Sequence, residues 1–242
     1  MNSSAPRIPE LLAPAGSFEK LITAIHYGAD AVYLSGKKYG LRAKAANFDE
    51  QDIVRAVDYA HRRGVKVYVT VNIIAHHDDF EGLEAYLKKL DQGGVDAIIV
   101  SDAGILQLAR GLVPSLPIHL STQANVTNSR SAAFWVEQGA ARLNLARELS
   151  FAEVGLIRQK VSAEIEVFAH GALCISYSGR CMLSTYMTGR DANQGKCAHP
   201  CRYSYALVEE KRPGEYFPVY EDERGTYIFN SKDLCLLKSL PE

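Results

Sequence analysis

The 242-residue sequence predicts an α/β fold, a (β/α)8 TIM-like barrel that is incomplete in this chain. Short apolar runs rich in β-branched residues alternate with segments of helical periodicity, which indicates a parallel sheet covered by helices. Polar residues follow the apolar runs throughout, and no G-x-G-x-x-G motif follows the first run. A barrel is therefore favoured over a doubly wound sheet of the dinucleotide-binding kind.

Seven apolar runs are expected to be strands, because each is short and almost continuously apolar, as strands buried on both faces are. In chain order they cover residues 10–15, 31–36, 66–73, 96–102, 117–123, 142–148 and 164–171. An eighth strand is not visible in the remaining sequence. The barrel is therefore expected to be incomplete.

The segments between these runs are predicted to be helices. The first begins at Ser17, a good N-cap residue, and ends at Gly28; the second begins at Asp49 and ends at Gly64. Further helices are expected over 80–94, 103–112, 129–139 and 150–161. A glycine just before the next strand recurs at several of these boundaries, as expected for a repeated strand–helix unit.

The pattern changes near residue 181. Residues 1–180 are predicted to form barrel strands 1–7, and residues 181–242 a cysteine-rich insertion with the start of the following helix. The insertion is rich in turns and aromatic residues and contains two strand-like pieces, YSYALVEE and GTYIFNS. We expect a small antiparallel β-hairpin there that closes over the barrel mouth.

The composition is typical of a soluble globular protein, with 47% hydrophobic and 23% charged residues. No run of about 18 apolar residues predicts a membrane span, and the N-terminus lacks the pattern of a secretory signal. We therefore expect a cytoplasmic protein without a membrane partner. Disulfides are rare in that compartment, so clustered cysteines favour metal ligands or catalytic groups.

A local basic cluster lies in the stretch SGKKYGLRAKAANF, although the whole chain has a net charge of only −1. Arg42 stands in it between Tyr39 and Phe48. Global charge neither predicts nor excludes a nucleic-acid partner. Arg42 is a candidate contact to phosphate or RNA, and a solvated surface is the alternative.

Neutral polar residues gather after the third and fifth predicted strands, where barrels of this kind carry their function. Ser121, Gln123 and Asn125 lie in LSTQAN, and Asn72 lies near the end of the third strand. We interpret these four as substrate-binding candidates suited to a polar, uncharged edge such as a nucleobase or peptide. Capping of a βα loop is the alternative explanation.

Three candidate catalytic residues follow later strands. Arg147 and Glu148 form either a salt-bridged rim or a site where Arg147 grips the carboxylate or phosphate of a small anionic co-substrate. His170 ends the seventh predicted strand and is either structural or an acid–base group. The adjacent His76 and His77 lack partners at helical spacing and are interpreted as surface residues rather than metal ligands.

All five cysteines lie in the last third of the chain: Cys174, Cys181, Cys197, Cys201 and Cys235. Zinc sites usually use closely spaced C-x2–4-C pairs, and only Cys197 and Cys201 approach that spacing. The wider spacing of Cys174 and Cys181 suits an iron–sulfur cluster held between a strand end and an insertion. An iron–sulfur cluster is favoured, while zinc, a cysteine nucleophile beside His170 and unliganded thiols stay open.

The stretch EVFAHGALCISYSGRCMLS resembles the signature of the collagenase-like peptidase family U32. The matching positions are Glu166, Phe168, Gly171, Cys174, Gly179, Cys181 and Ser184. Five other stretches also resemble the usual sequence of the family: ELLAPAG, GADAVYLSG, LSTQAN, RDANQGKCAHPCRYSY and NSKDLCLL. The resemblance covers nearly all of the chain, and the combined motifs are specific.

The resemblance implies more than one kind of activity. The family is named for a peptidase, whereas some members resemble RNA hydroxylation factors that form 5-hydroxyuridine at the tRNA wobble position or hydroxylate a ribosomal RNA cytidine. Further relatives assist ubiquinone hydroxylation without oxygen. The long segment RPGEYFPVYEDERGTYIFNSKDL looks most like the tRNA branch. An iron–sulfur-dependent tRNA hydroxylase is therefore the expected function, with a collagenase-like peptidase and a ubiquinone-hydroxylation factor as alternatives.

The resemblance also implies a cofactor and partners. The RNA-modifying members carry a 4Fe–4S cluster on four cysteines, which correspond here to Cys174, Cys181, Cys197 and Cys235, with Cys201 as the rival fourth ligand. Prephenate is the implied hydroxyl source and tRNA the implied partner. Members of the tRNA type usually run well past residue 242, so this chain is expected to be a fragment of a longer protein.

Overall fold

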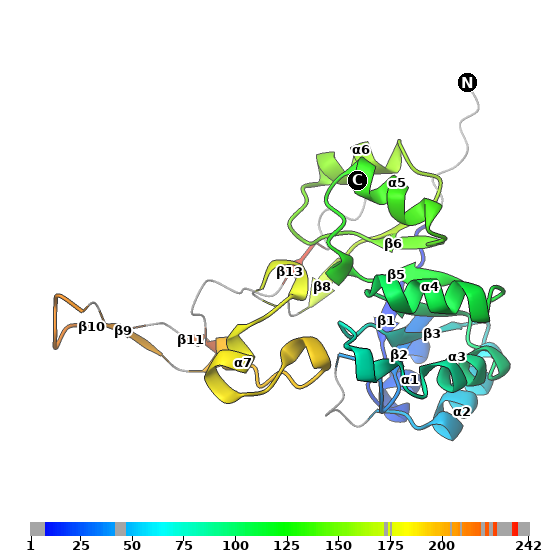
Figure 1. Ribbon diagram of the computed structural model, residues 1–242, viewed down its shortest axis with the longest axis horizontal. Helices are drawn as coiled ribbons and strands as arrows, with labels where there is room; N and C mark the ends of the chain where they lie inside the picture. The colour runs from blue at the N-terminus through cyan, green and yellow to red at the C-terminus, as the bar shows by residue number, and fades with distance from the viewer. Residues whose placement is uncertain are drawn as a thin grey trace.

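A curled sheet of seven parallel strands forms the body of the molecule (Figure 1). The computed structural model describes residues 8–41, 47–171, 174, 176–203, 205–208, 210–218, 221–222, 225–226 and 234–236. The strands are β1 (Leu12–Pro14), β2 (Ala31–Ser35), β3 (Lys66–Val71), β4 (Ala97–Val100), β5 (Ile118–Leu120), β6 (Arg142–Asn144) and β7 (Glu164–Glu166). Each strand pairs with the next one along the chain, which confirms the predicted incomplete barrel.

Helices follow the strands and cover the outer side of the sheet. They are α1 (Phe18–His26), α2 (Glu50–His61), α3 (Leu83–Gln92), α4 (Ala103–Leu112), α5 (Ser129–Glu137) and α6 (Phe151–Arg158). The predicted N-caps Ser17 and Asp49 are confirmed, because the side chain of each accepts a hydrogen bond from a backbone N–H in the first turn. Each cap starts its helix just after a loop that leaves a strand end.

The two faces of the sheet bury different residues, because successive side chains of a strand point to opposite sides. Val67 and Val69 of β3 belong to the large core between sheet and helices. Tyr68 lies between them in sequence and packs in a second cluster with Ala31, Ala97 and Ile99. This second cluster fills the inside of the barrel, so the sheet is apolar on both faces, as a parallel sheet requires.

A charged network lies at the amino-terminal ends of the strands. Arg142 at the start of β6 donates to Oε1 of Glu10 at 2.7 Å and also bonds Glu164 at the start of β7. Glu10 precedes β1 and further accepts from Tyr68 OH at 2.8 Å and Lys66 Nζ at 2.9 Å. The network therefore ties the start of the first strand to the last two strands of the open barrel.

The seventh strand is shorter than the sequence predicts. It ends at Glu166, and residues 170–171 belong instead to a separate strand, β8 (His170–Gly171), which pairs antiparallel with β13 (Leu234–Cys235). The prediction that His170 ends strand 7 was therefore wrong. A continuous apolar run cannot reveal where a chain leaves one sheet to pair with a distant segment.

The insertion contains the predicted hairpin, but its second arm and its place differ from expectation. The hairpin joins β9 (Ala206–Val208) to β10 (Tyr216–Pro218), and a small pair joins β11 (Glu221–Asp222) to β12 (Gly225–Thr226). Figure 1 shows the β9–β10 hairpin extending away from the barrel, so the expectation that it closes the mouth was wrong. Residues 177–194, which include α7 (Leu183–Thr188), contact the strand ends instead.

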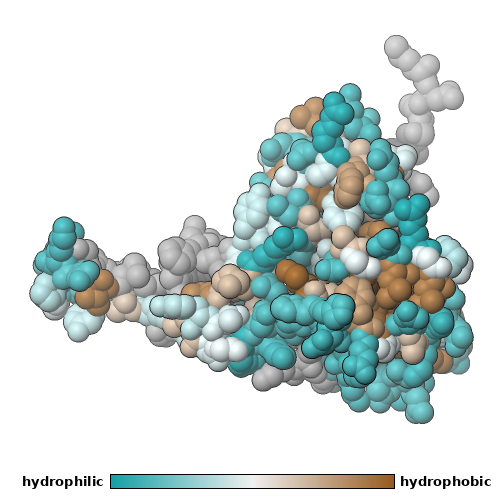
Figure 2. All heavy atoms as spheres, viewed as in Figure 1, coloured by the Kyte–Doolittle hydropathy of each residue, from teal (hydrophilic) through white to brown (hydrophobic). Residues whose placement is uncertain are grey.

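The visible outer surface is mostly hydrophilic, with hydrophobic side chains gathered over α4 (Figure 2). In the part of the chain that the structure describes, no helix is both long enough and apolar enough to cross a bilayer.

Candidate functional site

The neutral polar residues predicted at the strand ends meet in one hydrogen-bonded cluster. The side-chain oxygen Oε1 of Gln123 accepts from Ser121 Oγ at 2.9 Å and from Asn72 Nδ2 at 3.4 Å. Ser101 Oγ donates to the backbone carbonyl of Asn72 at 2.6 Å. Gln123 is only 4% exposed and Ser121 5%. The structure thus brings three of the four predicted residues together in a buried setting where polar groups need partners.

Asn125, the fourth predicted residue, belongs to the same region through the insertion. Its Oδ1 accepts from Ser178 Oγ at 2.8 Å, and Arg180 Nε donates to the carbonyl of Gln123 at 2.8 Å. Asn125 and Ser178 both have positive φ angles, 60° and 43°. A left-handed backbone is strained for residues other than glycine, so these contacts hold two tight turns against each other.

Arg147 and Glu148 hold the segment from Cys174 to Cys181, which we call the cysteine loop, onto the barrel. Arg147 Nη1 donates to the carbonyl of Cys174 at 2.9 Å, and Nη2 donates to the carbonyl of Ser176 at 2.7 Å. Glu148 accepts from the backbone N–H of Ser178 at 2.7 Å and from its Oγ at 3.1 Å. Both residues were predicted as catalytic candidates, and the structure engages each with the loop that carries Cys174.

Two residues that sequence reasoning missed fix the other side of this loop. The Asn193 side chain accepts from the N–H of Cys181 and donates to its carbonyl, both at 3.1 Å. Gln194 Nε2 bonds the carbonyl of Ile74 and contacts Asp79 at 3.2 Å. Their sequence, DANQG, shows only a turn, so nothing local indicated that an amide would clamp a cysteine 12 residues earlier.

Cys181, Cys197 and Cys201 lie in the insertion, and Cys174 lies just before it. Burial raises the pKa of the Cys201 thiol, and negative charge on Cys174, Cys197 and Cys181 raises it further, whereas Arg202 lowers it. The backbone N–H of His199 also donates to the Cys197 sulfur at 3.3 Å. Thiolate sulfur is a ligand that soft metal cations prefer.

Cys235, the fifth cysteine, lies on a strand that pairs with β8. It lies in β13, opposite His170 of β8, and the N–H of Leu236 donates to the carbonyl of Ala169 at 2.9 Å. Cys174 follows His170 by only four residues. Across the ranges that are described, no three His, Cys, Asp or Glu side chains are arranged to hold a single metal ion.

The remaining candidates lie elsewhere. His170 is exposed on β8, and Arg42 lies outside the described residues. The N–H of His76 donates to Asp79 Oδ2 at 2.7 Å at the start of a short 3-10 turn. His76 and His77 are both exposed, which confirms that they are surface residues, and their lack of a metal stays a prediction.

The interior of the barrel contains a second set of buried polar groups below the mouth. Asn144 Nδ2 donates to Glu166 at 2.7 Å, and burial raises the Glu166 pKa although Arg142 opposes that effect. Burial lowers the pKa of His119 to about 3, so this histidine is neutral at physiological pH. Of these groups His119 is the most buried, with 6% of its surface exposed.

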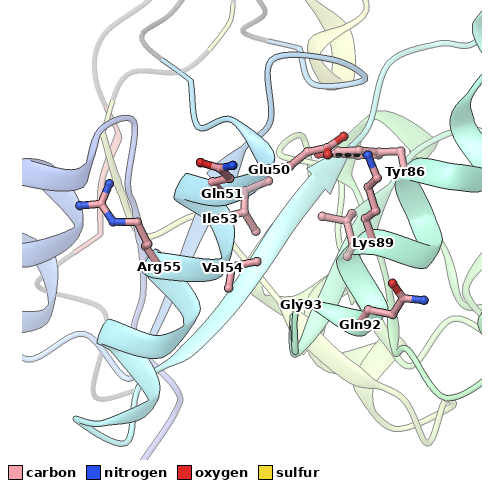
Figure 3. A pocket seen from close by; sticks show the side chains of 10 residues that line it. Glu50, Gln51, Ile53, Val54, Arg55, Tyr86, Lys89, Gln92 and Gly93 are labelled. Atoms are coloured by element: carbon pink, nitrogen blue, oxygen red, sulfur yellow. Dashed lines mark hydrogen bonds and ion pairs between the residues drawn. The ribbon is translucent and has the colours of Figure 1, made fainter.

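A surface cleft of about 650 Å³ lies between α2 and α3 (Figure 3). Tyr86, Val54 and the ion pair of Glu50 with Lys89, whose charged atoms are 2.6 Å apart, line it. The Tyr86 hydroxyl is buried without a hydrogen-bond partner in the described structure, and burial raises its pKa. The cleft belongs to the helix layer and contains none of the predicted site residues.

Comparison with known proteins places this arrangement in a family. The model of peptidase family U32 matches residues 16–242. The tRNA hydroxylation protein P1 of Bacillus subtilis is 46% identical over 97% of this chain and 55% of its own length. The tRNA hydroxylation protein P of Escherichia coli is 41% identical over 93% of this chain and 59% of its own length. The chain thus spans little more than half the length of these curated relatives.

A solved structure supports the fold. The U32 peptidase Mk0906 superposes with a TM-score of 0.62, at 18% identity, over 91% of this chain and 90% of that one. At this identity the likeness concerns the fold alone.

Proposed function

The chain belongs to peptidase family U32, and from that membership we propose that it acts in RNA modification, in the hydroxylation of the tRNA wobble uridine to 5-hydroxyuridine. The observation that carries the proposal is the position of the cysteine loop directly over the neutral polar cluster. Arg180, next to Cys181, donates to the carbonyl of Gln123. The names of the two bacterial relatives, both tRNA hydroxylation proteins, support the same reading.

The cysteines suit a 4Fe–4S cluster as the cofactor, which we propose on Cys174, Cys181, Cys197 and Cys235, with Cys201 as the rival fourth ligand. Thiolates are the usual ligands of such a group, and the loop that carries Cys174 and Cys181 is held by Arg147 and Asn193. When bound, an iron–sulfur cluster supplies electron transfer at the barrel mouth.

The polar cluster is suited to a nucleobase. Uracil presents carbonyl oxygens and one N–H at its edge, which neutral amides and hydroxyls match without burying a charge. Asn72, Ser121 and Gln123 supply such groups within one network, and Asn125 supplies another beside it through its bond with Ser178. In our proposal they orient the base, and their mutual hydrogen bonds keep them in place before it arrives.

A small anionic co-substrate, prephenate by family resemblance, needs a cationic partner near the mouth. Both terminal nitrogens of Arg147 are engaged by the loop carbonyls of Cys174 and Ser176. Arg180 is exposed and donates through Nε to the carbonyl of Gln123. We therefore assign the contact with the anion to the terminal nitrogens of Arg180, while Arg147 positions the loop.

The modified nucleosides of tRNA test the function directly. Bulk tRNA from cells with and without the gene would be digested and analysed by liquid chromatography and mass spectrometry. We expect 5-hydroxyuridine and nucleosides derived from it to disappear without the gene and to return on complementation with the full-length gene. Unchanged nucleosides in the deletion strain would refute the proposed function.

A further inference from the structure

The insertion exposes a set of large flexible and aromatic side chains. We call it the tyrosine surface, formed by Met182, Tyr186, Met187, Tyr203 and Tyr205. Tyr186 is 89% exposed and Met182 73%. These two residues are four positions apart across α7, so they lie on the same side of that helix. Exposed apolar groups of this size are costly in water and mark places where a partner binds.

Hydrogen bonds fix the orientation of two of its rings. Tyr203 and Tyr205 stack with centroids 6.1 Å apart and planes 22° from parallel. Tyr203 OH donates to the carbonyl of Ala198 at 3.2 Å, and Tyr205 OH donates to the carbonyl of Pro200 at 2.8 Å. Tyr205 OH also lies 3.4 Å from Met187 Sδ, which joins the ring pair to α7. The rings are therefore held by their hydroxyl ends.

Residues 176–203, which contribute most of this surface, have an excess of basic residues. Residues 176–203 contain one acidic residue and four Arg and Lys residues, whereas the whole chain has a net charge of −1. The basic residues are Arg180, Arg190, Lys196 and Arg202. Arg202 and Lys196 are exposed, and neither side chain forms an ion pair within the described residues. A phosphate backbone is the partner that such a combination of cations and aromatic faces fits.

The tyrosine surface also borders the cysteines. Cys201 lies beside Arg202 in the 3-10 turn Pro200–Arg202, which contacts α7. Cys197 precedes this turn by three residues, and Cys181 precedes α7 by two residues. A nucleic acid held on the tyrosine surface is therefore held close to the proposed reaction centre.

We propose that the tyrosine surface binds unpaired bases of an RNA loop by stacking, while Arg202 and Lys196 contact the phosphates. This inference rests on the proposed function, because it names the surface that presents an RNA substrate to the barrel mouth. Stacking is tolerant of sequence, so the surface binds the loop and the neutral cluster selects the base. Double-stranded RNA, whose bases are already stacked, is bound more weakly.

Binding of a labelled anticodon stem–loop RNA to the purified chain, followed by fluorescence anisotropy, tests the proposal. Tyr186→Ala should weaken binding about tenfold, the loss of roughly one stacked base. Tyr186→Trp should retain binding, and Tyr186→Leu should behave like the alanine variant. Arg202→Gln should lower the dependence of log affinity on log salt by roughly 0.7, the contribution of about one phosphate. Tyr27→Ala is the matched control, because Tyr27 is 86% exposed at the end of α1.

The outcomes separate this surface from the function on which it rests. Equal RNA affinity of the wild type, Tyr186→Ala and Arg202→Gln would refute the proposal that the tyrosine surface binds RNA. It would not affect the proposed function, which the nucleoside analysis tests. RNA binding retained by Tyr186→Leu but lost by Tyr186→Ala would show that an apolar contact suffices without aromatic stacking, and it also overturns the proposal. Absence of RNA binding by the wild-type chain overturns it too, whereas the nucleoside analysis alone decides whether the protein modifies tRNA. Circular dichroism of each variant confirms that it folds.

Discussion

Glu10 is the carboxylate on which the charged network at the amino end of the barrel depends. Burial pushes its pKa upward, but hydrogen bonds from Arg142, Lys66 and Tyr68 outweigh burial and lower the pKa to about 2. A carboxylate with a lowered pKa stabilises the fold above its ordinary pKa and loses that contribution as pH falls toward the folded value. Its contribution is therefore complete above about pH 4.5 and declines between pH 4.5 and 2.

Glu10→Gln should accordingly lower the free energy of unfolding at pH 7 by about 2 kcal/mol, because Arg142 loses one of its buried partners. Urea unfolding measured at several pH values would show the wild type and the variant converging as pH falls toward 2. The surface pair of Asp58 with Arg62 provides the control, and Asp58→Asn should change stability by less than about 0.5 kcal/mol. A pH-independent difference for Glu10→Gln would contradict the assignment.

At this scale the sequence predicts the chemistry of some residues and not of others. Asn72, Ser121 and Gln123 were predicted because strand periodicity places them at the carboxyl ends of the third and fifth strands of one sheet, and they do meet. Arg147 was assigned to the right place, but its contacts with Cys174 and Ser176 could not be predicted. Those contacts depend on the conformation of a loop that folds back onto the barrel. Loop conformation leaves no periodic pattern in the sequence from which it could be predicted.

At the scale of elements, the cysteine loop depends for its position on hydrogen bonds from other parts of the chain. Two hydrogen bonds from Arg147 reach the carbonyls of Cys174 and Ser176. Arg147→Met keeps much of the side-chain volume and removes both charged donors. Hydrogen bonds from a charged donor contribute roughly 1.5–3 kcal/mol each. The fraction of molecules with an opened loop should therefore be at least tenfold higher in Arg147→Met. Faster proteolysis within residues 174–181 of the metal-free protein would report this opening.

A matched variant distinguishes loss of the clamp from general loss of stability. Arg110 also donates to a backbone carbonyl, that of Gln138, but it lies in the outer helix layer. Arg110→Met should leave cleavage in the cysteine loop unchanged. Equal cleavage of the loop in wild type and Arg147→Met would mean that Arg147 does not hold it.

The prediction of elements succeeded where a period recurs and failed where the chain changes partner. Six helices and seven strands follow from alternation of apolar runs and glycine boundaries. β7 ends at Glu166. The pairing of β8 with β13 then joins residues more than 60 positions apart in the sequence. The packing of the whole chain decides such a pairing. A local apolar run has the same sequence pattern whichever sheet it joins, so it does not identify the partner strand.

For the whole molecule, the open barrel predicts a gradient of stability across the sheet. β3 is buried along almost its entire length and pairs on both sides, whereas β7 has partly exposed residues and pairs only with β6 in the sheet as described. Native-state hydrogen exchange should therefore be slowest for amides of β3 and β4 and at least tenfold faster for those of β7. The β9–β10 hairpin, which extends from the barrel, should exchange fastest of the paired strands. Uniform protection across β3 and β7 would contradict the open edge.

The central claim is that the cysteines at the barrel mouth form a cluster site over a base-binding cluster, and metal content after anaerobic purification tests it most directly. Iron and sulfide would be quantified in the wild type and in five single Cys→Ser variants, together with the visible absorption spectrum. The claim predicts about four irons per chain in the wild type, retained in Cys201→Ser and lost in Cys174→Ser, Cys181→Ser, Cys197→Ser and Cys235→Ser. Loss of iron in Cys201→Ser with retention of iron in Cys235→Ser would make Cys201, and not Cys235, the fourth ligand. A colourless protein that contains zinc or no metal would contradict the claim.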